Sequence, residues 1–164
     1  MKINRDLKKF KLLHKNRENQ IIYTSKKVKN DYEILNLIDN FLEEKDSFIF
    51  ESVEKGKIKG RYTIFGKNPD KIWEFNNNKS FIYRGKKKVN IKGDPKKVIE
   101  NIIEEFKFKI PKDLPPISSL LSGYFSYDII RYIENIPNSC RDDLKIPDAR
   151  IIRPQTVIIH DNYL

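Results

Sequence analysis

Residues 47 to 93 alternate short β-type runs with turns, and this alternation constrains the fold more than any other feature. The runs 47–53, 61–66, 71–76 and 80–85 are rich in aromatic and β-branched residues, and lysines accompany a shorter run at 87–93. Glycine, asparagine and lysine fill the connections, which is the composition of hairpin turns. The segment therefore predicts an antiparallel sheet made of consecutive hairpins.

Two other segments have the periodicity of amphipathic helices, residues 30–44 and 94–108. In the second, Asp94 is an N-cap residue and Pro95 occupies the first helical position, where its missing N–H has no consequence. We expect further strands at 21–28 and 156–161. The fold class is α+β, with antiparallel sheets built from consecutive hairpins and helices packed on the outside.

The remaining segments are less regular. Residues 120–137 are expected to begin extended and to turn helical after Asp128, and residues 140–154 read as a loop. Residues 1–19 form a charged N-terminal segment that leads into one domain at 20–164. Because the chain stops soon after the last expected strand, we expect this domain to be incomplete at its C-terminus.

The net charge raises the question of an anionic partner. Lysine and arginine total 33 against 23 acidic residues, a formal charge of +10. Most of these cations are lysines, whereas proteins that recognise bases or bind phosphates through two hydrogen bonds favour arginine. The composition therefore argues against nucleic acid as a partner. A basic binding module stays an alternative if six lysines gather on one surface: Lys86, Lys87, Lys88, Lys92, Lys96 and Lys97.

The cysteine content and the lack of long apolar segments indicate the cellular compartment. The single cysteine, Cys140, excludes an internal disulfide, and its thiol reads as idle or buried. The first residues contain no apolar core of signal-peptide length, and no run approaches the roughly 18 apolar residues of a membrane span. We expect a cytoplasmic protein without membrane contact.

The sequence contains no pattern that indicates a catalytic site. His14 lies in a charged segment, and His160 lies near the end of the last expected strand beside Asp161. Zinc-ligand spacing and a Walker phosphate loop are both missing from the sequence. We therefore expect this chain to contribute neither catalytic residues nor metal ligands.

Polar residues stand at the ends of two strands that must be buried. Glu51 and Ser52 close one apolar run, and Arg61 opens the next. One interpretation is a cross-strand ion pair between Glu51 and Arg61, and the other is a ligand site. Neighbours in a regular strand point to opposite faces, so Glu51 and Ser52 meet one ligand only where the strand bulges or ends.

Three stretches and the helix between them carry a family resemblance: FIFESVEKGKIKGRYTIFGKNP, LPPISSLLSGYFSYDIIRYIENIP and DDLKIPDARIIRPQTVIIHDN. Together they resemble the N-terminal domain of anthranilate synthase component I, a chorismate-utilising enzyme. The resemblance implies a lyase of tryptophan biosynthesis that converts chorismate and ammonia to anthranilate and pyruvate. A glutamine amidotransferase partner supplies the ammonia. Catalytic residues and Mg²⁺ are implied in a C-terminal domain that this chain lacks, so these 164 residues would be inactive alone.

The same resemblance implies a feedback site for L-tryptophan at Glu51 and Ser52, with Arg61 as its basic residue. Glu51 would complement the ammonium group of the amino acid, and Phe50, Val53 and Tyr62 would flank the indole. The block GYFSYD is expected to be structural. The alternative is the N-terminal domain of aminodeoxychorismate synthase component I, which belongs to the folate branch.

Overall fold

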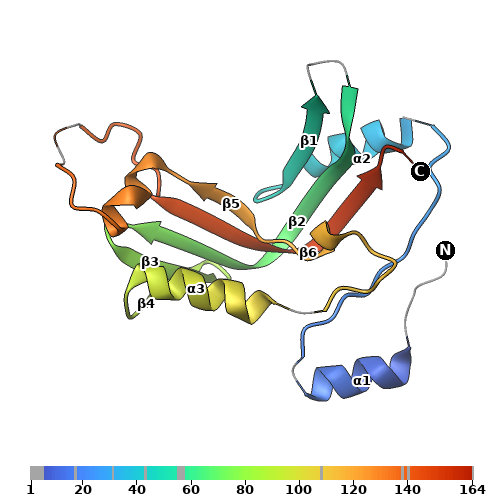
Figure 1. Cartoon of the computed structure of the whole chain (residues 1–164), viewed down its shortest axis with the longest axis horizontal. Coiled ribbons are helices and arrows are strands. Elements are labelled where there is room, and N and C mark those ends of the chain that lie inside the picture. Colours follow the sequence, from blue (N-terminus) through green and yellow to red (C-terminus); the bar gives the residue numbers. More distant parts are fainter. Residues whose placement is uncertain are drawn as a thin grey trace.

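The computed structural model describes residues 6–163 apart from 17, 31, 43, 55–57, 108, 138 and 140, and at 35, 37, 40–42, 52–54, 58 and 59 it describes the backbone alone. One bent antiparallel sheet carries helices on its flanks (Figure 1). The helices are α1 (Leu7–Lys15), α2 (Tyr32–Leu42) and α3 (Pro95–Phe106), with 3₁₀ turns at Pro116–Ser118 and Tyr127–Tyr132. The strands are β1 (Phe48–Glu54), β2 (Ile58–Asn76), β3 (Lys79–Arg84), β4 (Lys87–Ile91), β5 (Ser122–Phe125) and β6 (Ala149–Asp161).

The sheet has the order β4-β3-β2-β6-β5, and β1 pairs with β2 outside this path. All of these pairings are antiparallel. Since β6 occupies one edge of β2 along most of its length, β1 and β3 lie one after the other on the opposite edge. The C-terminal end of β6 therefore lies next to the start of β2, beside the β1–β2 hairpin (Figure 1).

A bend divides the β2–β6 pair into two halves. Pro69 lies directly opposite Pro154, and the register shifts between Pro69 and Lys71, which makes Asp70 the extra residue. The Asp70 carboxylate accepts two hydrogen bonds from Arg153 on β6, of which the Nε–Oδ1 bond is 2.7 Å long. This bond lowers the pKa of Asp70 below its ordinary value, so the pair persists into acidic solution.

The hydrophobic core lies between α3 and one face of the sheet. Trp73 and Phe75 on β2 pack with Ala149 and Ile151 on β6, and α3 contributes buried Val98 and Ile102. The Asp94 side chain accepts from the N–H of Lys96 at 3.1 Å, and Pro95 follows it. The N-terminal signals expected for this helix are thus confirmed, as is the α+β class.

The expected hairpin strands and the helices at 30–44 and 94–108 are confirmed. Three other expectations are wrong. The runs 61–66 and 71–76 are not separate strands but parts of the 19-residue β2, because a proline at a bulge bends a strand without ending it. The last strand begins at Ala149, so residues 149–154 of the expected loop belong to β6. Within the described residues 18–30, only Tyr23 forms a bridge in place of the strand expected at 21–28.

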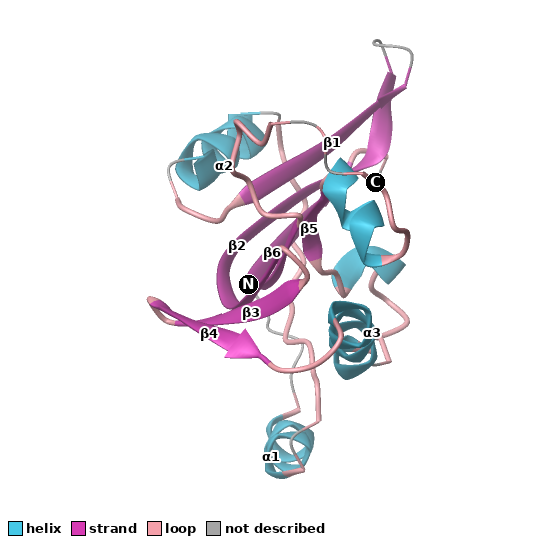
Figure 2. Ribbon diagram, turned by 90° about the vertical axis from the view of Figure 1, so that its left-hand side faces the viewer, coloured by secondary structure: helices cyan, strands magenta, loops and turns pink. Residues whose placement is uncertain are grey.

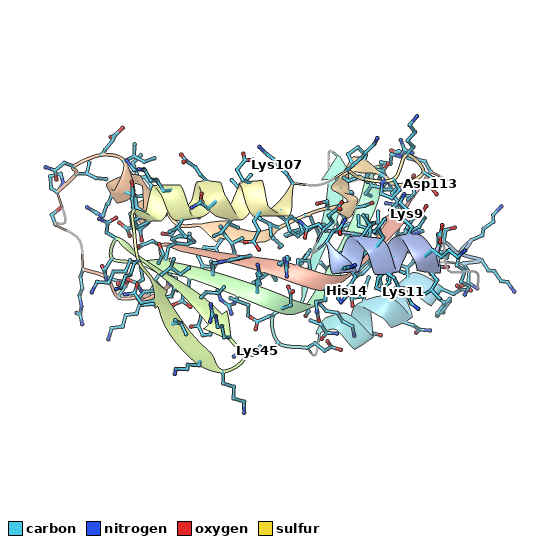
Figure 3. All side chains as sticks on the ribbon, turned by 90° about the horizontal axis from the view of Figure 1, so that it is seen from below. Lys9, Lys11, His14, Lys45, Lys107 and Asp113 are labelled. Carbon is cyan, nitrogen blue, oxygen red and sulfur yellow. The ribbon has the colours of Figure 1, made fainter. Side chains whose placement is uncertain are left out.

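The charged N-terminal segment contains a helix that the sequence pattern did not indicate. Asp6 caps α1 by accepting from the N–H groups of Lys8 and Lys9. The helix lies apart from the sheet in two perpendicular views (Figures 1 and 2), whereas α2 lies beside β1 and α3 covers the core. Figure 3 shows the labelled Lys9, Lys11 and His14 on this helix, where the His14 ring stacks on Phe10. None of the helices in the described part of the chain has the length and apolar character needed to span a membrane.

A close approach of two strands explains one glycine. A Cβ atom at Gly123 on β5 would lie 2.0 Å from the carbonyl oxygen of Arg150 on β6. We therefore expect Gly123→Ala to lower the free energy of unfolding by about 1–3 kcal/mol, since the strands must separate to admit the methyl group. Urea denaturation measures this change.

Gly85→Asn is the matched control. Gly85 has a φ of +61° with open space around it, a conformation that asparagine tolerates, so a change within about 0.5 kcal/mol is expected. Equal stabilities of the Gly123→Ala variant and the unsubstituted protein would contradict the close approach.

Candidate functional site

The β1–β2 hairpin contains an irregularity at the position of the predicted site. Glu51 pairs with Thr63 and Val53 pairs with Lys59, and the register shifts between the two pairs. In this interval β1 contributes only Ser52, while β2 contributes residues 60–62. The extra residues therefore lie on β2, opposite Ser52, and the pairing of the two strands is interrupted directly after Glu51. The Glu51 side chain is exposed, and the side chain of Ser52 lies outside the described part of the structure.

Arg61 lies within this bulge and has a carboxylate partner on another strand. Its Nε and Nη2 atoms donate to Oδ2 of Asp161 at 3.1 and 3.0 Å. Asp161, rather than Glu51, is therefore the ion-pair partner that the described residues give Arg61. The alternative interpretation of a Glu51–Arg61 ion pair is wrong. The guanidinium also lies over the Tyr62 ring, 5.0 Å from its centroid.

The turn that ends β6, residues 161–163, attaches to the same bulge. The Asn162 side chain donates to the carbonyl of Gly60 at 2.8 Å and to Thr63 Oγ1 at 3.4 Å, and its backbone N–H donates to the carbonyl of Arg61 at 2.8 Å. The backbone N–H of Tyr163 donates to Oδ1 of Asp161 at 3.1 Å. We call residues 161–163 the β6 turn. It holds both the backbone of the bulge and the side chain of Arg61.

The electrostatics of the pair follow from these contacts. The hydrogen bond to Arg61 is the main cause that lowers the pKa of the Asp161 carboxyl, and the N–H of Tyr163 adds to it. The same bond raises the pKa of Arg61. Both groups are therefore charged at neutral pH, and the pair is lost only when acid protonates Asp161 below the ordinary range of a carboxyl group. Exposed pairs of this kind contribute little to stability.

One expected neighbour of the site lies elsewhere. Phe50 precedes Glu51 in a regular part of β1, so the two side chains point to opposite faces. The Phe50 ring packs on Phe48, with 4.8 Å between centroids. Phe48 in turn covers Gly66 across the strand pair, where a Cβ atom would lie 2.3 Å from the ring. Phe50 therefore belongs to an aromatic pair on the other face of the hairpin.

Sequence reasoning missed Asp161 and Asn162. The residues HDN stood out only as a pair of His160 with Asp161 at a strand end. The signal that identifies them is the long-range register, which sets Tyr62 against Asp161. This register joins residues about 100 positions apart and becomes visible only once β2 and β6 are known to pair.

The lysines of the alternative basic module do not share one surface. Lys88 donates to Glu74, which is 7% exposed, and its ammonium lies 4.4 Å from the centroid of the Phe81 ring. Glu74 points away from the core face because its neighbours Trp73 and Phe75 pack toward α3. Lys96 and Lys97 open α3 on the other side of the sheet. The six lysines therefore do not all share one face, because Lys88 lies on the face opposite α3, whereas Lys96 and Lys97 belong to α3.

The part of the chain that the structure describes offers no metal site. The described residues bring together no group of three or more His, Cys, Asp and Glu side chains that could hold a metal ion. Cys140 lies outside the described residues.

Comparisons with known proteins assign the fold first. The structure shares its fold with part of a crystal structure of anthranilate synthase component I from Streptococcus pneumoniae, with a TM-score of 0.52 and 20% identity over 85% of this chain and 30% of that one. The fold is therefore that of an anthranilate synthase component I domain. No protein-family model matches the chain.

Curated relatives agree with the fold. The chain is 34% identical over 149 residues to anthranilate synthase component 1 of Cereibacter sphaeroides, and 35% identical over 129 residues to the protein of that name from Acetivibrio thermocellus. The matches cover 88% and 78% of this chain but only 30% and 26% of the relatives. The chain therefore belongs with the anthranilate synthase component 1 family, as a homologue of one part of these proteins.

The contacts of the β6 turn predict the effect of Asn162. We expect Asn162→Ala to lower the free energy of unfolding by about 0.5–1.5 kcal/mol, because the carbonyl of Gly60 loses its side-chain donor. Hydrogen exchange should accelerate at the backbone amides of residues 61–63. Asn90→Ala, on the exposed edge strand β4, is the control and should leave both measurements unchanged. If hydrogen exchange at residues 61–63 is unaltered in the Asn162→Ala variant, the β6 turn does not stabilise the bulge.

Proposed function

We propose that this chain is the regulatory N-terminal part of an anthranilate synthase component I. The full-length protein would convert chorismate and ammonia to anthranilate and pyruvate in tryptophan biosynthesis. The observation that carries this proposal is the identity of 34% over 149 residues to a protein named anthranilate synthase component 1. The likeness to a solved component I supports it through the fold.

The proposal assigns the chemistry to the longer proteins. Their catalytic residues and Mg²⁺ would lie in a chorismate-binding domain beyond the 30% that this chain matches, and a glutamine amidotransferase subunit would deliver the ammonia. The described residues contain no carboxylate cluster suited to Mg²⁺, which prefers several oxygen ligands. On this proposal, the 164 residues alone have no turnover.

The proposal places a feedback site for L-tryptophan at the β1–β2 bulge, with Glu51, Ser52 and Arg61 as its residues. Three features support this placement. Glu51 is exposed, Arg61 supplies a cation in the bulge of the facing strand, and the pairing of β1 with β2 is interrupted directly after Glu51. Glu51 would accept from the ammonium group, and such charge-assisted bonds contribute about 1.5–3 kcal/mol.

The product of the reaction tests the family branch. Full-length protein incubated with chorismate, Mg²⁺ and an ammonium salt should release anthranilate, which chromatography with fluorescence detection identifies. Formation of aminodeoxychorismate instead would assign the protein to the folate branch. A variant lacking residues 1–164 tests whether this part is needed for turnover.

Inhibition tests the tryptophan site. Glu51→Gln should raise the concentration of L-tryptophan that halves the rate by about tenfold or more, because the ammonium loses a charged acceptor. Ser52→Phe should abolish inhibition by filling the bulge, and both variants should keep the uninhibited rate. Glu100→Gln, on the exposed side of α3, is the matched control. Normal inhibition of both site variants would refute the assignment.

A further inference from the structure

The β6 turn supplies a charged residue to the bulge that the proposed effector site does not include. Asp161 comes from the end of β6, whereas Glu51 and Arg61 come from the β1–β2 hairpin. Its Oδ2 accepts two hydrogen bonds from Arg61, at 3.1 and 3.0 Å. Arg61 is the cation suited to an amino-acid carboxylate, so any such ligand meets a guanidinium that already has a carboxylate partner.

The two partners differ in how open they are to a ligand. The Asp161 side chain is 19% exposed and the Arg61 side chain is 53% exposed. Asp161 is also fixed independently of Arg61, because its Oδ1 accepts from the backbone N–H of Tyr163 at 3.1 Å. The carboxylate is thus the fixed member of the pair, and the guanidinium is the member that an incoming molecule can reach.

The geometry leaves donors on Arg61 for a second acceptor. A guanidinium has five N–H groups in a planar fork, and Asp161 engages Nε and Nη2. A ligand carboxylate can therefore either share the guanidinium through Nη1 or replace Asp161 on it. In both arrangements two negative charges lie around one positive charge, and their repulsion opposes binding.

We propose that Asp161 is the counter-ion of the effector site, which holds Arg61 while the site is empty and competes with the ligand carboxylate for it. This inference rests on the proposed tryptophan site and adds a residue from β6 that tunes its affinity. Asp161 acts through Arg61 and is therefore a positioning residue. Its competition applies only to ligands that carry a carboxylate.

Two ligands isolate this effect. L-Tryptophan has a carboxylate, whereas L-tryptophanamide has the same indole and ammonium groups without it. Calorimetric titration of the full-length protein should show that Asp161→Asn binds L-tryptophan about two- to fivefold more tightly, the range expected for one exposed charge interaction. Binding of L-tryptophanamide should not tighten. Asparagine keeps the size of aspartate, and its amide oxygen can still accept from Arg61.

Asp70→Asn is the matched control, because it removes the other carboxylate that pairs with an arginine between β2 and β6. It lies at the bend of the sheet and should leave both affinities unchanged. Thermal unfolding of each variant verifies that it is folded. Unchanged or weaker L-tryptophan binding by a folded Asp161→Asn variant overturns the inference, as does equal tightening for both ligands.

A measurement on the unsubstituted protein does not depend on the folding of any variant. The Nε–H resonance of Arg61, assigned with Arg61→Lys, should shift on addition of L-tryptophan and not on addition of its amide. Failure of the effector site and failure of the role of Asp161 give different results. If neither ligand binds, the effector site itself is refuted. If Glu51→Gln abolishes binding but Asp161→Asn changes nothing, only the role of Asp161 is refuted.

Discussion

The antiparallel pairing of β2 with β6 is the interaction on which the rest of the structure depends. β1 and β3 pair with β2, β5 pairs with β6, and β4 reaches the sheet only through β3. The core residues under α3 come mainly from these two strands, as do the bulge and the β6 turn of the candidate site. The contacts around the β1–β2 bulge therefore join residues some 100 positions apart in the chain.

Local sequence signals identified the elements that depend on local physics. The hairpin strands followed from β-type runs and turn residues, and α3 followed from Asp94, Pro95 and a regular apolar stripe. The errors arose where a distant partner overrides the local signal. Residues 61–66 and 71–76 read as two strands, yet β2 continues through Pro69 because Pro154 and the extra residue Asp70 accommodate the bend. Residues 149–154 read as a loop, although pairing with β2, and also with β5 at residues 149–152, makes them part of a strand.

The candidate site divides in the same way. Glu51, Ser52 and Arg61 were predicted through a family resemblance carried by the sequence around them, together with the requirement for a bulge. Asp161 and Asn162 were not predicted. Nothing in the residues HDN (160–162) distinguishes an ordinary strand end from a turn that contacts another hairpin. Their role depends on the register between β2 and β6, which the sequence does not display.

The paired prolines have a consequence for how the sheet assembles. Two long antiparallel strands can slip by two residues and keep every side chain on its original face. Here Pro69 and Pro154 face each other, so the missing N–H groups fall on a single rung of the ladder. A slipped alignment separates the prolines, weakens two rungs, and moves Asp70 away from Arg153. The facing prolines thus favour the observed register at the centre of the sheet, where the alignment of β2 and β6 sets the position of every strand beside them.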